Sequence, residues 1–104
     1  MKKIIVAGFA ALVFSASVQA VHLDRKFPVC VSLDSFERLM AIVKHADKQA
    51  FDEIMQSECL MLKRNVPVDK IVSLDGGVGH VKVYTNGQLL DLWTNSENVK
   101  LEGQ

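Results

Sequence analysis

The chain has 104 residues, carries 12 basic and 12 acidic side chains, and is 49% hydrophobic. That length accommodates one ordinary domain rather than two. The charge balance lacks the basic excess typical of nucleic-acid binders, and the hydrophobic content is too high for a disordered chain. Two of the basic residues, Lys2 and Lys3, belong to a distinct first segment. Without them the chain is slightly acidic.

Residues 1–20 have the pattern of a secretory signal peptide. Lys2 and Lys3 give a positive start, Ile4–Phe14 is an apolar run, and Ala20 ends a stretch of small residues suited to cleavage. A membrane span needs about 20 apolar residues, which this run does not reach, so we expect no membrane anchor. We expect cleavage after Ala20 and export to the bacterial periplasm or beyond, with residues 21–104 forming one domain.

Cys30 and Cys59 are the two cysteines of the chain. An even cysteine count in a small exported domain indicates a disulfide. Closing a loop of about 30 residues contributes about 3–4 kcal/mol in the chain-entropy account of disulfide stabilisation. A redox role is not expected, because the chain has no Cys-x-x-Cys pair.

Residues 29–58 are predicted to form an extended segment followed by two short helices. Asp34 and Glu37 have the spacing of a capping box, so Asp34 is the expected N-cap of the first helix. Asp47 is the expected N-cap of the second. Apolar residues recur at helical spacing in two stripes: Phe36, Leu39, Met40 and Val43, then Ala50, Phe51, Ile54 and Met55.

Residues 59–99 are predicted to form the β part. Pro67 marks a turn or an edge, because proline lacks the hydrogen-bond donor of a strand ladder. The polar tail from Asn95 onward closes on the sheet through Val99 and Leu101. The expected strands are Cys59–Leu62, Lys70–Leu74, His80–Thr85 and Gln88–Thr94. The fold class is therefore α+β, with a disulfide that joins the ends of the helical part.

Asn86-Gly87 lies between two alternating runs and predicts a two-residue hairpin turn, which fixes the strand register. Beyond the glycine-rich turn, Val72 is expected opposite Val81 and Ser73 opposite His80. Alternation then divides the hairpin into two faces. The aliphatic face, expected in the core, carries Val81, Val83, Leu90 and Leu92. The mixed face carries His80, Lys82, Tyr84, Leu89, Asp91 and Trp93.

The mixed face has two interpretations. It is either a solvated sheet face or second small core, with Trp93 under the helices, or a ligand-binding surface. Aromatic residues with a polar tip are enriched in binding surfaces, and this is the argument for the second interpretation at Tyr84 and Trp93.

The β part has a short apolar strand at 60–62, a strand at Lys70–Leu74 and a glycine-containing turn. A Val-Lys-Val strand, an Asn-Gly turn and a strand ending in Trp93 follow. This order, from Cys59 to Val99, resembles bacterial SH3-like (SH3b) modules. The resemblance implies a small antiparallel SH3-like sheet or barrel, and we expect the two predicted helices, which are not part of that pattern, to pack on it. It also implies peptide or cell-wall binding, at the positions of Tyr84 and Trp93.

Motifs for catalysis are weak. Gly76–Gly79 superficially suggests a phosphate loop but lacks the Gly-Lys-Ser/Thr ending. His45 with Asp47 and Asp52 suggests a metal site, although Asp47 is better explained as a helix cap. No serine lies in a nucleophile elbow. We therefore expect no enzyme activity, no metal and no cofactor.

The leading hypothesis is an exported binding protein that recognises a peptide, a protein or a peptidoglycan component through the mixed face, without nucleic acid. The alternative is an inhibitor or immunity protein for a secreted or cell-wall-active enzyme. In that case the acidic helices would carry the contacts, because an acidic patch steers association with a basic hydrolase.

Overall fold

The computed structural model describes residues 20–101; the expected signal peptide lies outside the described residues except for Ala20. The helices are α2 (Leu33–Lys44) and α3 (Lys48–Ser57). The strands are β1 (Val21–Leu23), β2 (Pro28–Cys30), β3 (Cys59–Met61), β4 (Val66–Pro67), β5 (Lys70–Ser73), β6 (Val78–Thr85), β7 (Gln88–Asn95) and β8 (Val99–Leu101). Short 3-10 turns, Asp75–Gly77 and Ser96–Asn98, precede β6 and β8.

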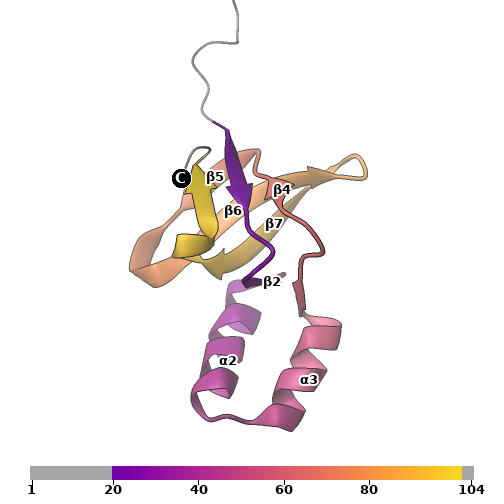
Figure 1. The fold of residues 1–104 in the computed structure, drawn as a ribbon, viewed down its shortest axis with the longest axis vertical. Helices are drawn as coiled ribbons and strands as arrows, with labels where there is room; N and C mark the ends of the chain where they lie inside the picture. Colours follow the sequence, from indigo (N-terminus) through magenta and orange to yellow (C-terminus); the bar gives the residue numbers. More distant parts are fainter. Residues whose placement is uncertain (1–19, 102–104) are drawn as a thin grey trace, which may run out of the picture.

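The described chain is α+β, with two helices and two antiparallel sheets. The larger sheet has the order β3-β2-β7-β6-β5, and the smaller has the order β4-β1-β8. Figure 1 shows the two helices as a hairpin at one end of the molecule, with the sheets at the other end. The sheets do not close into one continuous barrel within residues 20–101. None of the described helices is long and apolar enough to cross a membrane.

Two clusters of buried residues hold these parts together. The sheet core lies between the sheets and contains Leu23, Val29, Val81, Val83 and Leu92. The helical core lies where the helices meet β2 and β3 and contains Cys30, Phe36, Leu39, Ile54 and Cys59. Neighbouring residues Val29 and Cys30 of β2 belong to different cores, because successive strand side chains point to opposite faces.

The first helix begins earlier than the sequence predicted. Its N-cap is Ser32, whose Oγ accepts a 3.0 Å hydrogen bond from the Ser35 backbone N–H. The prediction of Asp34 as N-cap is therefore wrong. Asp34 lies in the first turn, where the helix dipole favours a negative charge, and pairs with Arg38 at 3.2 Å. The prediction of Asp47 is confirmed, since its side chain accepts from the Ala50 N–H at 3.1 Å.

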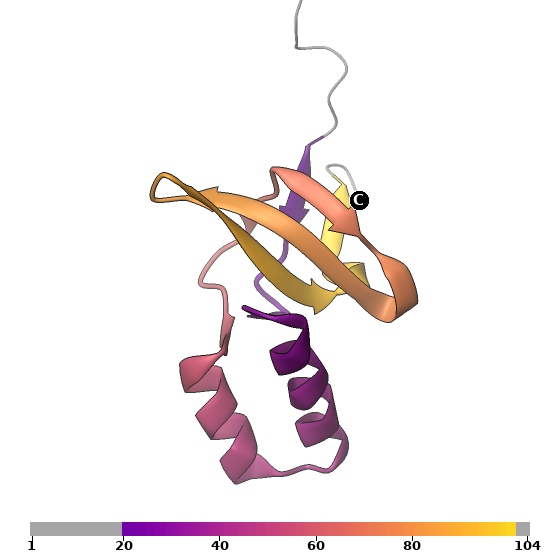
Figure 2. The ribbon, with the colours of Figure 1, turned by 180° about the vertical axis from the view of Figure 1, so that it is seen from behind.

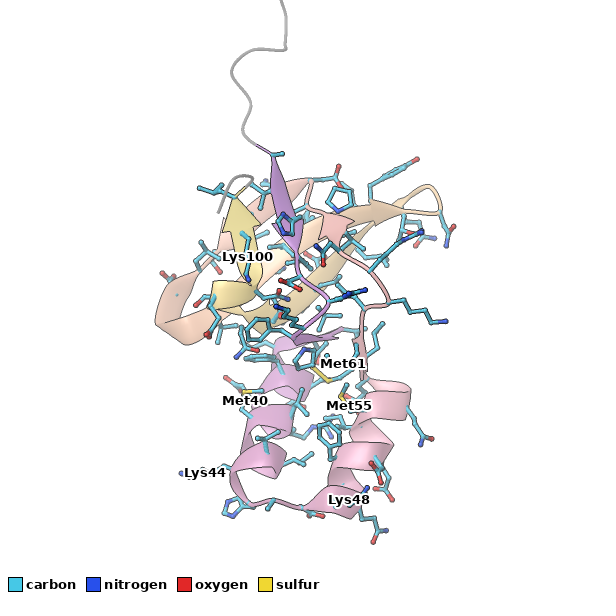
Figure 3. The ribbon with its side chains drawn as sticks, in the orientation of Figure 1. Met40, Lys44, Lys48, Met55, Met61 and Lys100 are labelled. Carbon is cyan, nitrogen blue, oxygen red and sulfur yellow. A yellow bond between two sulfur atoms is a disulfide. The ribbon has the colours of Figure 1, made fainter. Side chains whose placement is uncertain are left out.

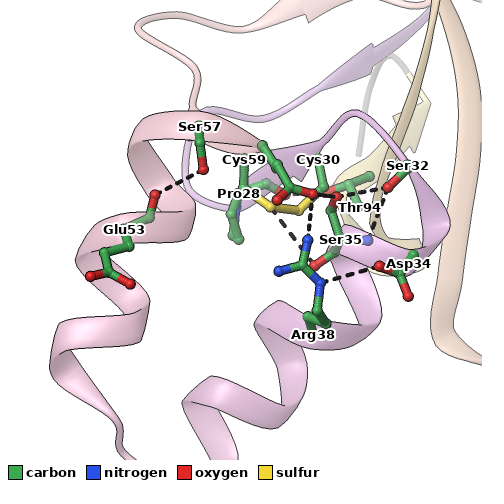
Figure 4. The surroundings of a disulfide bond; sticks show 11 residues. Pro28, Cys30, Ser32, Asp34, Ser35, Arg38, Glu53, Ser57, Cys59 and Thr94 are labelled. Atoms are coloured by element: carbon green, nitrogen blue, oxygen red, sulfur yellow. Dashed lines mark hydrogen bonds and ion pairs between the residues drawn. A yellow bond between two sulfur atoms is a disulfide. The ribbon is translucent and has the colours of Figure 1, made fainter.

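The Cys30–Cys59 disulfide is confirmed. The two cysteines are cross-strand partners of β2 and β3, so the bond joins the chain entering α2 to the chain leaving α3. Ser35 and Arg38 lie beside the disulfide (Figure 4). The carboxylate of Glu58 accepts hydrogen bonds from Ser35 Oγ and from the Arg38 guanidinium, and the three side chains form a polar cluster. These donors, Ser35 first, hold the pKa of Glu58 below its ordinary value. Disulfide and cluster together fasten the ends of the helical hairpin.

The predicted hairpin register is confirmed at every pair from Thr85–Gln88 to His80–Trp93. Asn86 and Gly87 have φ of 51° and 80°, as a two-residue turn of this kind requires. Ser73 lies opposite His80 as expected. The partner of Val81 is Ile71 and not Val72, because a bulge shifts the register of β5.

The sequence predicted only part of the smaller sheet. The expected contact of the tail is present, since β8 pairs with β1 at Val21–Leu101 and Leu23–Val99. No strand was predicted at β1. Pro67 lies in the edge strand β4, in keeping with its missing donor.

Candidate ligand-binding face

The outer face is the mixed face of the β6–β7 hairpin. The confirmed register places its predicted site residues on one side of the two strands: His80, Lys82, Tyr84, Leu89, Asp91 and Trp93. Figure 2, turned by 180° from Figure 1, shows the long hairpin as part of a twisted layer above the helices. The opposite face carries Val81, Val83 and Leu92, which are buried. Leu90, predicted in the core, is 39% exposed near the hairpin end.

Asp91 is the centre of the polar part of the outer face. Its Oδ1 accepts from Lys82 Nζ at 2.9 Å and lies 2.8 Å from His80 Nε2. The hydrogen bond from Lys82, followed by that from His80, lowers the pKa of the Asp91 carboxyl. All three groups are partly shielded from water, which strengthens their interaction relative to a fully exposed ion pair.

His80 also stacks on Trp93, with 4.1 Å between ring centroids and 15° between planes. Trp93 packs against the helical core and is the cross-strand partner of Cys30. Trp93 therefore belongs to the second small core, as one of the two interpretations predicted. His80 extends that core onto the outer face.

A groove of about 360 Å³ lies beside this stack, between the start of α2 and the strands. Its floor includes His80 and Trp93, and its rim includes Glu37 from α2 and Asp75 from the turn before β6. The carboxylates of Glu37 and Asp75 make no hydrogen bond or ion pair within residues 20–101. The remaining lining residues are Leu33, Ser73, Gly76 and Val78.

Sequence reasoning did not place Glu37 or Asp75 in the site. Glu37 was interpreted as a capping residue, and Asp75 as part of a turn. The signal that could have found Asp75 is the pairing of Ser73 with His80, which places the intervening turn beside that histidine. No sequence pattern indicated that the start of α2 lies beside the strands that carry His80 and Trp93.

Tyr84 and Leu89 lie at the other end of the outer face, with 61% and 54% of their surface exposed. They pair directly with each other in the register. Tyr84 lies four positions after His80 along β6, which corresponds to roughly 13 Å at about 3.3 Å per residue. The structure thus divides the predicted set into an apolar pair near the hairpin end and a polar cluster beside the groove.

The other sequence motifs form turns, caps and buried contacts. Gly76 and Gly77 form the 3-10 turn before β6, with φ of 63° and 81°, so Gly76–Gly79 does not precede a helix. Among the described residues, His45, Asp47 and Asp52 do not form a metal-ligating group, and no other set of three such side chains does. Ser35 donates to Glu58 but is fully buried, so a substrate has no access to its hydroxyl.

No family model, curated protein or solved structure matches this chain.

Proposed function

We propose that this chain is an exported, non-catalytic binding protein that recognises a short extended peptide segment, carried by a protein or by peptidoglycan. The SH3-like resemblance of residues 59–99 supports a binding role. The leader pattern of residues 1–20 and the Cys30–Cys59 disulfide support export, because disulfides persist in oxidising compartments.

One observation carries this proposal: the groove has a fixed aromatic floor and a rim of carboxylates without partners. His80 is held on one side by stacking with Trp93 and on another by Asp91. A side chain that is already fixed loses little conformational entropy when a ligand contacts it. The floor is therefore preorganised for binding.

The rim selects the charge of the ligand. Glu37 and Asp75 are exposed at the groove, and the described residues supply no cation to either. A lysine-like amine or an arginine guanidinium of a peptide would form charge-assisted hydrogen bonds there. The roughly 13 Å from His80 to Tyr84 then accommodates about four extended residues, ending on the apolar pair Tyr84 and Leu89.

The single tryptophan of the chain provides the assay, because Trp93 lies in the groove. Its fluorescence is titrated with short peptides that carry an amine or guanidinium, with acidic peptides of equal length, and with soluble peptidoglycan fragments. The double change Glu37→Gln and Asp75→Asn is expected to weaken binding of the cationic ligands at least about tenfold, or 1.4 kcal/mol. Tyr84→Ala with Leu89→Ala is expected to weaken binding of the longer peptides.

Matched controls lie on the helical hairpin. Glu53→Gln removes an exposed carboxylate from α3, and Val43→Ala trims an apolar side chain that is 56% exposed on α2. Neither is expected to change the affinity. Equal binding by wild type and the Glu37→Gln, Asp75→Asn protein would show that this groove is not the site.

The alternative, an inhibitor or immunity protein, has support at the far end of the helices. An apolar depression of about 420 Å³ between α2 and α3 is lined by Val43 and Phe51, with Asp47 and Asp52 at its border. Phe51 is 37% exposed, and an accessible aromatic side chain beside carboxylates suits a partner with a basic rim. Inhibition of purified muramidases or proteases that is lost on Phe51→Ser and retained on Tyr84→Ala would favour this function over the first.

A further inference from the structure

A separate cluster of basic residues lies on two loops that are far apart in sequence. One loop, after β1, contains Arg25 and Lys26, and the other, after β3, contains Lys63 and Arg64. The two segments run side by side in both Figure 1 and Figure 2. A 3.0 Å hydrogen bond from the Arg25 N–H to Asn65 Oδ1 joins them. We call this cluster, with Asn65, the basic loop site.

None of the four cations of the basic loop site makes an ion pair within the described part of the chain. Residues 20–101 contain six Lys and Arg side chains without an ion pair, and four of them gather here. All four are exposed. Like charges brought together without a counter-ion repel one another, so this arrangement costs free energy that a bound anion would offset.

Part of the cluster lines a hollow of about 380 Å³, whose lining residues are Arg25, Lys26, Arg64 and Asn65 together with Asp24. The carboxylate of Asp24 is already neutralised. Its Oδ1 accepts from the Lys26 N–H at 3.1 Å and its Oδ2 pairs with Lys100 Nζ at 3.3 Å. Burial alone would raise the pKa of Asp24, but these contacts lower it. The hollow is therefore positive despite this carboxylate.

Asn65 adds a neutral donor of fixed direction. Because its Oδ1 accepts from Arg25, its amide Nδ2 is turned away from that contact and makes no hydrogen bond within the described residues. The hollow is thus lined by one amide N–H₂ and two guanidinium groups, all of which donate hydrogen bonds. The paired N–H donors of a guanidinium match the oxygen geometry of phosphate. Chemistry of this kind recognises an oxyanion with several oxygens.

We propose that the basic loop site binds a terminal phosphate group, as carried by a phosphorylated carbohydrate or a lipid headgroup. Arg25 and Arg64 hold the phosphate oxygens through paired N–H donors, Asn65 donates one further bond, and Lys26 and Lys63 supply charge. The site is distinct from the groove at His80 and Trp93 and does not depend on the function proposed for that groove.

The test uses protein produced from the complete chain, titrated calorimetrically with inorganic pyrophosphate at about 0.15 M ionic strength, where long-range attraction is screened beyond about 8 Å. Arg25→Gln with Arg64→Gln is expected to weaken binding at least about tenfold. The matched control is Lys44→Gln with Lys70→Gln, which removes the same charge from the other two unpaired cations. Figure 3 shows Lys44 at the far end of the helical hairpin. The control is expected to bind within about twofold of wild type. Equal weakening in both variants, or no binding by wild type, overturns the proposal.

A second variant separates recognition from folding. Asn65→Asp keeps an oxygen acceptor for the Arg25 N–H but replaces the amide donor with a negative charge, so it is expected to abolish pyrophosphate binding while thermal stability stays near that of wild type. Undiminished binding by this variant would contradict the assigned donor. Two further probes then distinguish a phosphorylated carbohydrate from a lipid headgroup. Glucose 6-phosphate is compared with glucose, and vesicles of phosphatidic acid are compared with vesicles of phosphatidylcholine. Failure of both to bind overturns the assignment to a terminal phosphate.

Discussion

The imidazole of His80 lies flat against the indole of Trp93, 4.1 Å away between centroids. One partner belongs to the helical core and the other carries the hydrogen bond to Asp91. This aromatic contact thus couples the helical hairpin to the outer face of the sheet. A ligand that engages His80 acts on a side chain supported by both parts of the fold.

Asp91→Asn is expected to destabilise the protein at neutral pH and to flatten its acid denaturation. Lys82 and His80 lower the pKa of the Asp91 carboxyl in the folded state. A depressed folded pKa means stability that is present above the unfolded pKa, near 3.9, and is lost as pH falls through the folded value. The difference in urea midpoint between wild type and variant is therefore largest above about pH 4 and shrinks below it.

Asp75→Asn serves as the matched control for this pH dependence. Its carboxylate is exposed and makes no ion pair within the part of the chain that the structure describes. Its urea midpoint is expected to follow that of wild type between pH 7 and pH 3. A pH-independent difference for Asp91→Asn would contradict the role given to its charge.

Ser32→Ala is expected to cost about 1 kcal/mol of the free energy of unfolding, the usual effect of losing an N-cap. Asp34→Ala is expected to cost less, because Asp34 is 81% exposed and contributes only a first-turn charge and an i,i+4 pair. Urea denaturation followed by circular dichroism measures both values. A larger loss of stability for Asp34→Ala than for Ser32→Ala would identify Asp34 as the N-cap.

Reduction of the disulfide is expected to lower Tm by more than about 10 °C, because the disulfide contributes about 3–4 kcal/mol to the stability of a domain of this size. Cys30 and Cys59 both lie in the helical core against which Trp93 packs. The near-ultraviolet signal of Trp93 is therefore expected to change on reduction as well. The Cys30→Ala, Cys59→Ala protein is the control, because its Tm cannot respond to a reductant. An unchanged Tm for reduced wild type would refute the stabilising role.

The hairpin was predictable because Asn86-Gly87 fixes a turn type, and the turn type fixes every pair behind it. The disulfide was predicted from the even cysteine count together with the expectation of export. The groove was not predictable, because it depends on where α2 lies over the sheet, and no local pattern encodes that position. Strand β1 has three residues, too few for alternation to be visible. The bulge in β5 likewise leaves no sequence signal, so Val72 was placed opposite Val81 in error.

Gly79 tests the contact between the two sheets. It is buried in β6 and has no positive φ, so space rather than backbone conformation explains the absence of a side chain there. A Cβ at this position would lie 2.9 Å from Val99 Cγ2 and 3.4 Å from Ser96 Cα. Gly79→Ala is therefore expected to cost about 1–3 kcal/mol by overpacking.

Val99→Ala removes the obstructing methyl groups, so a double-mutant cycle isolates this clash. Alone, Val99→Ala is expected to cost about 1–2 kcal/mol for the apolar atoms lost from the sheet core. Combined with Gly79→Ala it is expected to cost less than the two separate effects added together, with a coupling of at least about 0.5 kcal/mol. Urea denaturation of the four proteins gives this coupling. Strict additivity would mean that β8 and its preceding turn do not pack on β6 as described, and that the smaller sheet does not brace the strand that carries His80.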